Sequence, residues 1–398
     1  MTHSDTPKGP LHGVRVLDLT RILAGPSSTQ LLGDYGADIV KVERPGKGDD
    51  TRAWGPPYVR DADGFDTTES AYYMATNRNK RSIALDMATP EGADTIRQLA
   101  TKCDILVENF KTGGLKKYGL DYPSLKAINP SIIYCSITGF GQTGPNAGLA
   151  GYDLMAQGYG GIMSLTGEPD GTPMKVGVGI ADIMCGMYAS TAILAALRHR
   201  DQTGEGQHID VALVDTQIAW LINEGVSYLT SGKIPQRQGN EHPNIVPYQI
   251  FEVSDGHLII AVGNDTQFAK FCAAIGHPEL AEDARYTVNI DRIANREALL
   301  GTLIPIIKQI NKETLLSTMN AAGVTCGPIH NIAEVFASDQ VAARDMKITI
   351  PHPLSGSGTV DLIGNPVKFS QTPVTYRKAP PVCGADTDEI LNDWLKED

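Results

Sequence analysis

The sequence predicts an α/β fold built on a parallel, doubly wound sheet, because short apolar runs alternate with stretches of helical periodicity. The apolar runs lie at residues 14–19, 38–43, 82–85, 104–107 and 132–136, and helical stretches lie at residues 27–35 and 90–102. Such alternation is typical of parallel strands that are joined by crossover helices. Several runs are rich in Val and Ile, as expected of strands buried on both faces of a sheet.

The turn after the first apolar run is the place where a dinucleotide-binding fold carries GxGxxG. Residues 20–26 read TRILAGP instead, so the fingerprint is missing. A Rossmann-like sheet without it can still bind a nucleotide-containing ligand in the crevice at the carboxyl ends of its strands. The fold class therefore stands, while a nicotinamide-dependent oxidoreductase is disfavoured.

The length of 398 residues exceeds what one hydrophobic core usually serves, so two domains are expected. We expect a large domain over residues 1–205, completed by a return segment at 331–398. Residues 206–230 are expected to form a linker. Residues 231–330 are expected to form a smaller α+β domain, because a Pro-, Gly- and Asn-rich stretch is followed there by one apolar run and three helical stretches.

Composition excludes several classes of function. The charge balance is 34 − 46 = −12, with no long basic run, so nucleic acid is not an expected partner and an anionic ligand needs a local basic site. Six widely spaced cysteines without CxxC indicate neither a disulfide scaffold nor a metal site. Residues 1–10 lack signal-peptide character, and no apolar run approaches the ~20 residues that span a bilayer. We expect a cytoplasmic protein outside the membrane.

Asp182 is one carboxylate in an uncharged stretch, between VGVGIA at 176–181 and an apolar helix that follows. One interpretation is a helix N-cap, a role that Asp favours. The other is a nucleophile, kept ionised by the positive end of the helix dipole. A carboxylate that attacks a thioester forms a mixed anhydride, and the released thiolate can then form an enzyme-bound thioester. The two interpretations are compatible.

Several spaced motifs together resemble the family III CoA-transferases, of the formyl-CoA and carnitine CoA-transferase type. The motifs are VRVLDLTRILAGP at 14–26, KVERPGKGDDTR at 41–52, NRNKRSIALD at 77–86, ILVENF at 105–110, SITGFGQTGP at 136–145, GYDLMAQ at 151–157 and VGVGIADIMCGMYASTAILAAL at 176–197. The resemblance covers nearly the whole chain. It implies an interlaced homodimer, a CoA thioester as substrate with no tightly bound cofactor, a free carboxylic acid as the second substrate, and Asp182 as the nucleophile.

The resemblance also implies which residues contact CoA. These are Arg21, Ile22, Leu23, Ala24, Arg44, Lys80, Asn109, Gly114 and Lys117. Read without the resemblance, the basic residues Arg44, Lys80, Arg81, Lys116 and Lys117 are what the phosphates of CoA require in an acidic protein. The alternative for each of them is a solvated basic face.

Segments at 48–59, 77–82 and 244–251 resemble succinyl-CoA:glutarate CoA-transferases, which points to a dicarboxylate acceptor. Arg78 is a candidate for gripping the distal carboxylate through two parallel hydrogen bonds, although it could instead bind phosphate or face water. Tyr152 and His242 are further candidates for the substrate site. The glycine loop of formyl-CoA transferases has no counterpart at 238–243, which argues against formate and oxalate.

Two rival functions stay open at this point. The same family includes α-methylacyl-CoA racemases, which need an acid and a base. Those enzymes carry Gly-His-Asp where this chain has Gly151, Tyr152 and Asp153, and a tyrosine with a pKa near ~10 is a poor substitute for the histidine. The other rival is a catalytically silent CoA-binding protein, in which Asp182 is only a cap.

Overall fold

The computed structural model describes residues 8–396, so most of the N-terminal segment considered above lies outside the described residues. The chain divides into two compact units. The first comprises Met1–Ile162, Lys175–Gly232 and Asp339–Asp398, and the second comprises Met163–Met174 and Lys233–Ser338.

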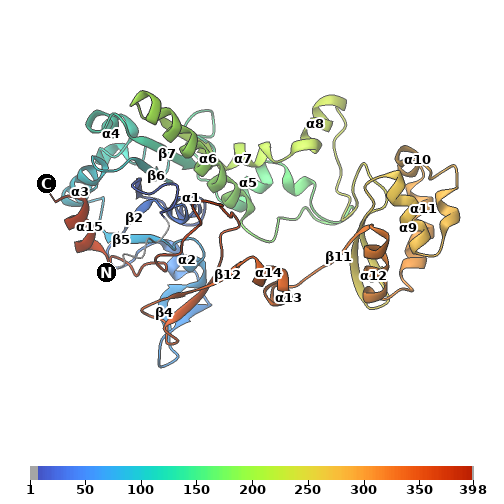
Figure 1. The fold of residues 1–398 in the computed structure, drawn as a ribbon. Coiled ribbons are helices and arrows are strands. Elements are labelled where there is room, and N and C mark those ends of the chain that lie inside the picture. Colours follow the sequence, from blue (N-terminus) through green and yellow to red (C-terminus); the bar gives the residue numbers. More distant parts are fainter. Residues whose placement is uncertain (1–7, 397–398) are drawn as a thin grey trace. The chain divides into compact units, whose positions relative to one another are not determined.

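The first unit is built on a sheet of six strands, all paired in parallel (Figure 1). The strands are β1 (Arg15–Asp18), β2 (Asp38–Glu43), β5 (Lys80–Ala84), β6 (Ile105–Glu108), β7 (Ile133–Thr138) and β8 (His208–Ala212). Their spatial order is β5-β2-β1-β6-β7-β8. Counted along the chain this is the doubly wound Rossmann order, with its reversal between β1 and β6. The predicted parallel α/β sheet is confirmed.

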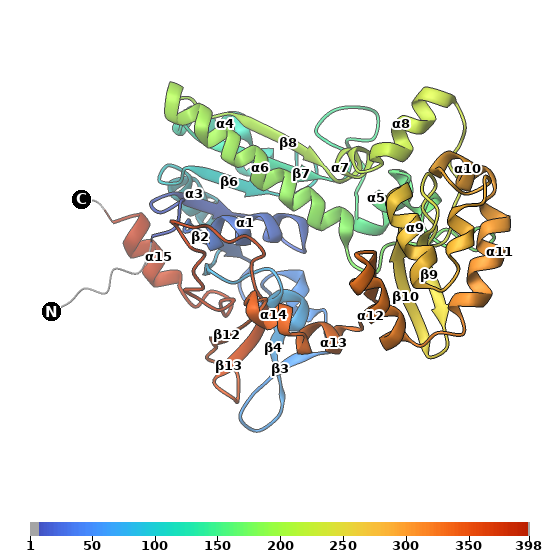
Figure 2. The same cartoon turned by 45° about the vertical axis from the view of Figure 1, so that its right-hand side comes forward.

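Helices cover both faces of this sheet. On one face lie α1 (Ala24–Asp34) and α6 (Ile180–Thr203), which run side by side in Figure 2. On the other face lie α3 (Pro90–Ala100), α4 (Tyr122–Ile128) and α15 (Thr387–Trp394). Strand residues alternate between two buried cores, so that Val16 packs on the α1 and α6 side and Leu17 on the other side. This double burial explains the apolar runs in the sequence.

Small residues bring α6 very close to α1. A Cβ on Gly186 would lie 2.6 Å from the carbonyl oxygen of Ala24, so only glycine fits there. One turn further on, the hydroxyls of Ser28 and Ser190 are 3.0 Å apart. By length and composition α6 could cross a membrane, but half of its most apolar window is buried within the protein.

The remaining elements of the first unit extend this layered body. They are η1 (Asp50–Ala53), β3 (Tyr58–Arg60), β4 (Asp66–Ser70), α2 (Ala71–Met74), η2 (Lys116–Tyr118), α5 (Asp153–Tyr159), α7 (Leu213–Ala219), α8 (Ile222–Ser231), α14 (Asp339–Ala343), β12 (Lys347–Pro351) and β13 (Thr359–Ile363). A short turn, η3 (Ile162–Ser164), follows α5. Residues 206–230, which we expected as a linker, contain β8, α7 and α8. Backbone pairing of β8 with β7 makes them part of the sheet domain.

The second unit is an α+β body with its own core. Its antiparallel sheet has the order β11-β10-β9, formed by β9 (Tyr248–Val253), β10 (Gly256–Ala261) and β11 (Thr325–Pro328). Its helices are α9 (Asp265–Ala274), η4 (Pro278–Ala281), α10 (Asn289–Ala294), α11 (Arg296–Ile307), α12 (Lys312–Ala322) and α13 (Ile332–Ala337). Residues 163–174 also belong here, because the Arg237 guanidinium donates hydrogen bonds to three of their carbonyl groups.

The return segment closes the edge of the large sheet. The Arg377 guanidinium donates to the carbonyls of Gly33, Gly36 and Ala37. Further along, Trp394 of α15 is buried and its indole N–H donates to Asp38 at 2.9 Å. The C-terminal residues are thereby fixed to the β2 and β5 side of the sheet.

Candidate active site

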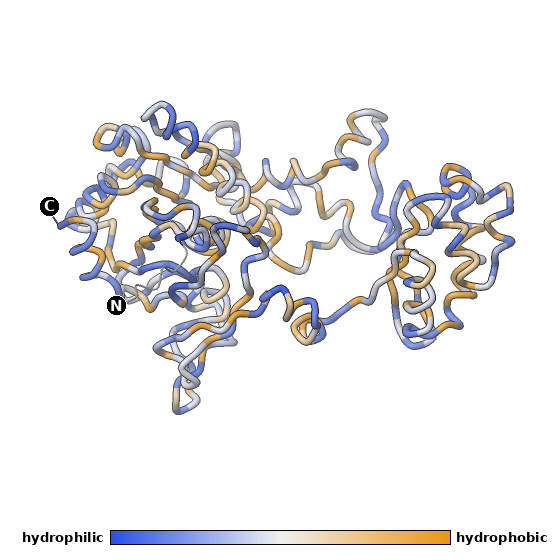
Figure 3. The backbone as a smooth tube through the Cα atoms, viewed as in Figure 1, coloured by the Kyte–Doolittle hydropathy of each residue, from blue (hydrophilic) through white to orange (hydrophobic). Residues whose placement is uncertain are grey.

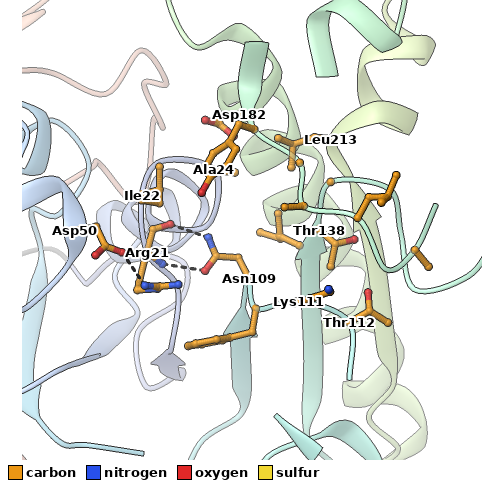
Figure 4. Close-up of a pocket in the computed structure, with 18 of the residues that line it drawn as sticks. Arg21, Ile22, Ala24, Asp50, Asn109, Lys111, Thr112, Thr138, Asp182 and Leu213 are labelled. Carbon is orange, nitrogen blue, oxygen red and sulfur yellow. Dashed lines mark hydrogen bonds and ion pairs between the residues drawn. The ribbon is translucent and has the colours of Figure 1, made fainter. Parts of the chain in front are cut away.

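The main cavity lies where the strand order reverses. Since the crossovers leave β1 and β6 in opposite directions, a crevice opens beyond their carboxyl ends. A cavity of about 530 Å³ occupies this place, lined by the segments that follow β1, β6 and β7 and by the first turn of α6. Figure 4 shows Asp182, Ala24 and Leu213 together at one end, with Lys111 and Thr112 at the other.

The loop after β1 is anchored from below by buried charges. Asp18, Lys41 and Lys80 are completely buried. The Lys80 ammonium lies 3.1 Å from an Asp18 oxygen, and the Lys41 ammonium donates to the carbonyl of Thr20 at 2.8 Å. Lys41 also pairs with Asp49 at 2.9 Å, and Asp49 in turn accepts the N–H of Ile22 at 3.2 Å.

This network stays charged although it is buried. Burial opposes ionisation of Asp18, but the charges of Lys80 and Lys41, with hydrogen bonds from two threonines, hold its pKa at about 2. Burial lowers the pKa of Lys80 to about 8, against the opposing charge of Asp18. The paired charges fix the loop in a conformation in which Ile22 has a φ of 74°, an unusual value for a β-branched residue.

Asp182 is the third residue of α6 and not its cap. The cap comes from Asp153 at the start of α5, whose Oδ1 accepts the N–H of Ala181 at 2.8 Å and that of Asp182 at 3.4 Å. The other Asp153 oxygen accepts from Gln157, and Gln157 accepts the N–H of Val176. A carboxylate from a second helix thus accepts two of the first N–H groups of α6, so the Asp182 side chain does not serve as the cap.

Two effects act on the Asp182 carboxyl. It is 9% exposed and lines the cavity. Burial, followed by repulsion from Asp153, raises the pKa of Asp182 to about 7. Among neighbouring side chains, the Cys185 thiol has a pKa raised well above its usual range by burial, so it stays protonated. Asp182 is therefore the group here that can change its charge near neutral pH.

Two aromatic residues that sequence reasoning did not single out belong to the surroundings of this carboxyl group. The pKa of Tyr72 is raised by burial and by the charges of Asp182 and Asp153, so its hydroxyl keeps its proton. Its ring packs edge-on against Trp54 at 5.1 Å, and Trp54 lines the cavity. Trp54 stood in the segment 48–59 and Asp153 in the motif GYDLMAQ, but neither was assigned this role, and Tyr72 carried no local signal that would separate it from other residues.

The residues expected to contact CoA fall into several places. Arg21, Ile22, Ala24 and Asn109 line the main cavity, as does the substrate candidate Tyr152. Leu23 is nearly buried between the loop and Gly179. Arg44 lines an adjoining cavity of about 160 Å³ that shares Arg21, Asp50 and Phe110 with the main one. Gly114 and Lys117 line two other hollows.

The expected basic cluster is not one cluster. Lys80 is buried in the network below the loop and reaches no cavity surface. Arg81 is bound to Asp38, Asp393 and Glu389. The remaining three basic residues are spread over separate hollows. The physical reason is that β5 lies inside the sheet domain, so its long cationic side chains find carboxylates within the fold.

Arg78 also differs from its expected placement. It is 4% exposed, and its Nε donates to Asp34 Oδ1 at 2.9 Å while Nη1 donates to the carbonyl of Ile363 at 2.8 Å. Nη2 pairs with Asp34 Oδ2 at 2.5 Å, and Asn79 and Asn365 also donate to Asp34. The guanidinium does hold a carboxylate through two parallel bonds, but the carboxylate belongs to the protein. Its geometry therefore gives no support to a substrate clamp.

His242 lies in the second unit. Its Nδ1 accepts the N–H of Asn244 at 3.1 Å, and its ring packs on Tyr248 at 5.1 Å. Within residues 8–396 no group of three or more His, Cys, Asp or Glu side chains is placed to hold a metal ion. The main cavity offers carboxylates, aromatic rings, backbone N–H groups and the cations of Arg21 and Lys111.

Comparison with known proteins decides the family. The sequence profile of CoA-transferase family III matches residues 11–387. The chain belongs to this family. It is 50% identical over 98% of its length to the succinate–glutarate CoA-transferase of Agrobacterium fabrum, covering 97% of that protein. It is 42% identical to the human succinyl-CoA:glutarate CoA-transferase, with 98% of this chain and 87% of that one covered.

A solved structure agrees with this assignment. A CAIB/BAIF family protein from Brucella suis superimposes with a TM-score of 0.86 at 50% identity, over 97% of this chain and 100% of that one. The family III CoA-transferase described here therefore acts on CoA thioesters, and its cavity at the strand reversal is the candidate place for them.

We expect Arg78→Ala to lower the free energy of unfolding of this CoA-transferase by about 3–5 kcal/mol, because Asp34 would stay buried without its cation. A matched control is Arg60→Ala, which removes the exposed Arg60–Asp66 pair (3.0 Å) and should change stability by only about 0–1 kcal/mol. Denaturation followed by circular dichroism measures both. Unchanged stability together with a selective loss of transfer to diacids would instead support Arg78 as the residue that binds the distal carboxylate of the substrate.

Proposed function

We propose that the enzyme moves CoA from succinyl-CoA to a free dicarboxylic acid of the glutarate type. The observation that carries the proposal is the placement of Asp182, an otherwise unpaired carboxylate at the cavity end where the loop after β1 meets α6. The names of the 50% and 42% identical relatives supply the substrate class. The cavity offers the reacting groups that such a transfer needs.

The proposed reaction begins with the ionised Asp182 oxygen. It attacks the thioester carbonyl, and the C–S bond breaks. CoA thiolate is released, and the product on the enzyme is an acyl–aspartyl anhydride. The thiolate then attacks the Asp182 carbonyl, which releases succinate and forms an aspartyl–CoA thioester. The acceptor carboxylate attacks this thioester and releases the thiolate again. Attack of the thiolate on the new acyl group gives the product thioester and restores the Asp182 carboxylate.

The surroundings of Asp182 suit these steps. The first-turn N–H groups and dipole of α6 favour negative charge near its start. Tyr72 keeps a proton that its hydroxyl can donate to an oxygen that becomes negative during attack. Burial of the carboxyl limits access of water to the anhydride and the thioester, either of which water would hydrolyse.

We assign ligand contacts by position. Arg21, Ile22, Leu23, Ala24 and Asn109 contact the CoA chain near Asp182, and the outer residues Arg44, Gly114 and Lys117 contact its nucleotide part. Tyr152 remains our candidate for contacting the acyl group, and a role for His242 stays a prediction. For the distal carboxylate, the cations that line the cavity are Arg21 and Lys111, and they replace Arg78 in this role. Lys80 supports the loop from below.

We also propose a cytoplasmic, interlaced homodimer that is not embedded in a membrane. On α8 the side chains of Ile222, Val226 and Leu229 share one helical face and are 67%, 60% and 80% exposed in the single chain. On α6, Met187 and Tyr188 are also exposed. Apolar residues recur along these helices (Figure 3). A second copy of the chain is the partner that would cover such faces.

Wild-type enzyme should transfer CoA from succinyl-CoA to glutarate and other diacids, and poorly to butyrate. Asp182→Asn should abolish transfer, because an amide cannot attack the thioester, while CoA binding measured by calorimetry persists. Mass spectrometry after incubation with succinyl-CoA and hydroxylamine should place the modification on the peptide that contains Asp182. Transfer by Asp182→Asn, or a label on Cys185, would contradict the mechanism.

The rate at saturating substrates should rise with pH through about 7, the pKa of Asp182, because only the ionised carboxylate attacks. Asp153→Asn removes the neighbouring negative charge but keeps an oxygen that can accept the N–H of Ala181. The pKa of Asp182 should therefore fall, and the acidic limb of the kcat profile should move to lower pH. An unmoved limb would mean that Asp153 does not set this pKa.

Light scattering at assay concentration should report a dimer that yields no active monomer on dilution. Leu229→Asp should disrupt it, because a charge would enter the apolar face of α8. The control is Ser227→Asp, which places the same charge on another side of the helix and should leave the dimer intact. An active monomer of the unaltered chain would contradict the proposed assembly.

A further inference from the structure

A second buried carboxylate, Glu108, lies beside the active cavity and takes no part in the chemistry described above. Glu108 is the last residue of β6 and is 5% exposed. One of its oxygens accepts the N–H of Phe110 at 2.7 Å. Within residues 8–396 no cation lowers the pKa of Glu108. A carboxylate buried without a counter-charge is costly, so its retention needs an explanation.

A hydrogen-bonded chain joins Glu108 to two neighbouring strands. Glu108 is in register with Ser136 on β7, and the Ser136 hydroxyl hydrogen-bonds the carboxylate. Ser136 Oγ also lies 2.9 Å from Nε2 of His208 on β8. His208 stacks on Tyr122 at 5.1 Å and reaches the surface.

The charges around Glu108 do not hold it in one protonation state. Burial raises its pKa to about 7, against the hydrogen bonds from Ser136 and Phe110, and the charge of Asp210 adds to the rise. The titratable and charged groups around it, including those lining the adjoining hollow, are Lys111, Lys116, Asp121, Tyr122, Tyr134, Cys135, His208 and Asp210. Burial lowers the pKa of His208, which is therefore neutral at this pH.

Glu108 is connected to the loop of the active cavity through two residues that follow it. The Asn109 side chain accepts the N–H of Arg21 at 3.0 Å and donates to the Arg21 carbonyl at 2.7 Å (Figure 4). The Arg21 guanidinium lies over the Phe110 ring, 5.3 Å from its centre. The Phe110 N–H is the group that Glu108 holds. Residues 109–112 and the loop after β1 are thus joined, and both line the cavity.

We propose that the ionised Glu108 is a positioning residue for the acyl-CoA: by holding the Phe110 N–H it keeps residues 109–112 against the Arg21 loop, and its protonation loosens that contact. The inference rests on the proposed function of the cavity. An ionised acceptor makes a hydrogen bond roughly twice as strong as a neutral one, so the loop is held firmly only while Glu108 is charged. As pH falls through about 7, acyl-CoA binding weakens.

The test is Glu108→Gln, an isosteric side chain that still offers an oxygen to the Phe110 N–H but carries no charge. At pH 8 its KM for succinyl-CoA should rise about three- to tenfold, with kcat nearly unchanged, as expected for the loss of a charged hydrogen bond. The rise of KM that the wild type shows below pH 7 should be absent in the variant. A KM that matches the wild type at every pH would overturn the proposal.

Ser136→Ala gives an independent test that does not depend on how well Glu108→Gln folds. Loss of the Ser136 hydroxyl removes a hydrogen bond that lowers the pKa of Glu108. The midpoint of the KM profile should therefore move to higher pH, while KM well above that midpoint stays at the wild-type value. A merely structural role would raise KM at all pH values alike. If the proposed function itself fails, wild-type enzyme will not transfer CoA from succinyl-CoA to a dicarboxylic acid, whereas failure of this inference leaves that transfer intact.

Discussion

The pairing of buried charges beneath the loop after β1 is the constraint on which the active cavity depends. Asp18, Lys41 and Lys80 are removed from water entirely, and each is tolerated only because the others neutralise it. Through Thr20 and Asp49 the same charges set the path of the backbone past Ile22. The glycine-rich loop of a dinucleotide-binding fold achieves its shape by backbone freedom, whereas here ion pairs impose it.

The placement of Asp182 also depends on how the helices α1, α5 and α6 pack at the cavity. Gly186 lets α6 approach the carbonyl of Ala24, and that approach delivers Asp182 to the loop. Asp153 then caps α6 in place of a local residue, so the Asp182 carboxyl group is not engaged in capping the helix. Burial raises the pKa of Asp182 to about 7, and repulsion from the same Asp153 carboxylate adds to the rise. One neighbouring side chain, Asp153, thus both caps the helix that carries Asp182 and contributes to the raised pKa of Asp182.

Three strands of the sheet contribute side chains to a hollow that adjoins the active cavity. Glu108 on β6 is in register with Ser136 on β7, and the Ser136 hydroxyl lies 2.9 Å from Nε2 of His208 on β8. Parallel strands place the ends of successive segments at one edge, so a chemical link across three strands forms without any local motif. The CoA-transferase thereby has two buried carboxyl groups whose pKa is raised to about 7, Asp182 at the active cavity and Glu108 beside it.

The sequence by itself determined the α/β class, the absence of GxGxxG and the family, and it singled out Asp182 as the candidate nucleophile. It could do so because strand and helix periodicity and spaced motifs are local properties of the chain. It also placed most strands of the large sheet within a residue or two of their observed bounds. Tertiary structure decided the partners of charged groups. Lys80 and Arg78 read as ligand contacts in the sequence, yet Asp18 and Asp34 bind them, and these carboxylates lie 62 and 44 residues away along the chain. Electrostatic pairing depends on distance in space and on burial, neither of which a local pattern contains, and the role of Asp153 as a cap for a distant helix was hidden for the same reason.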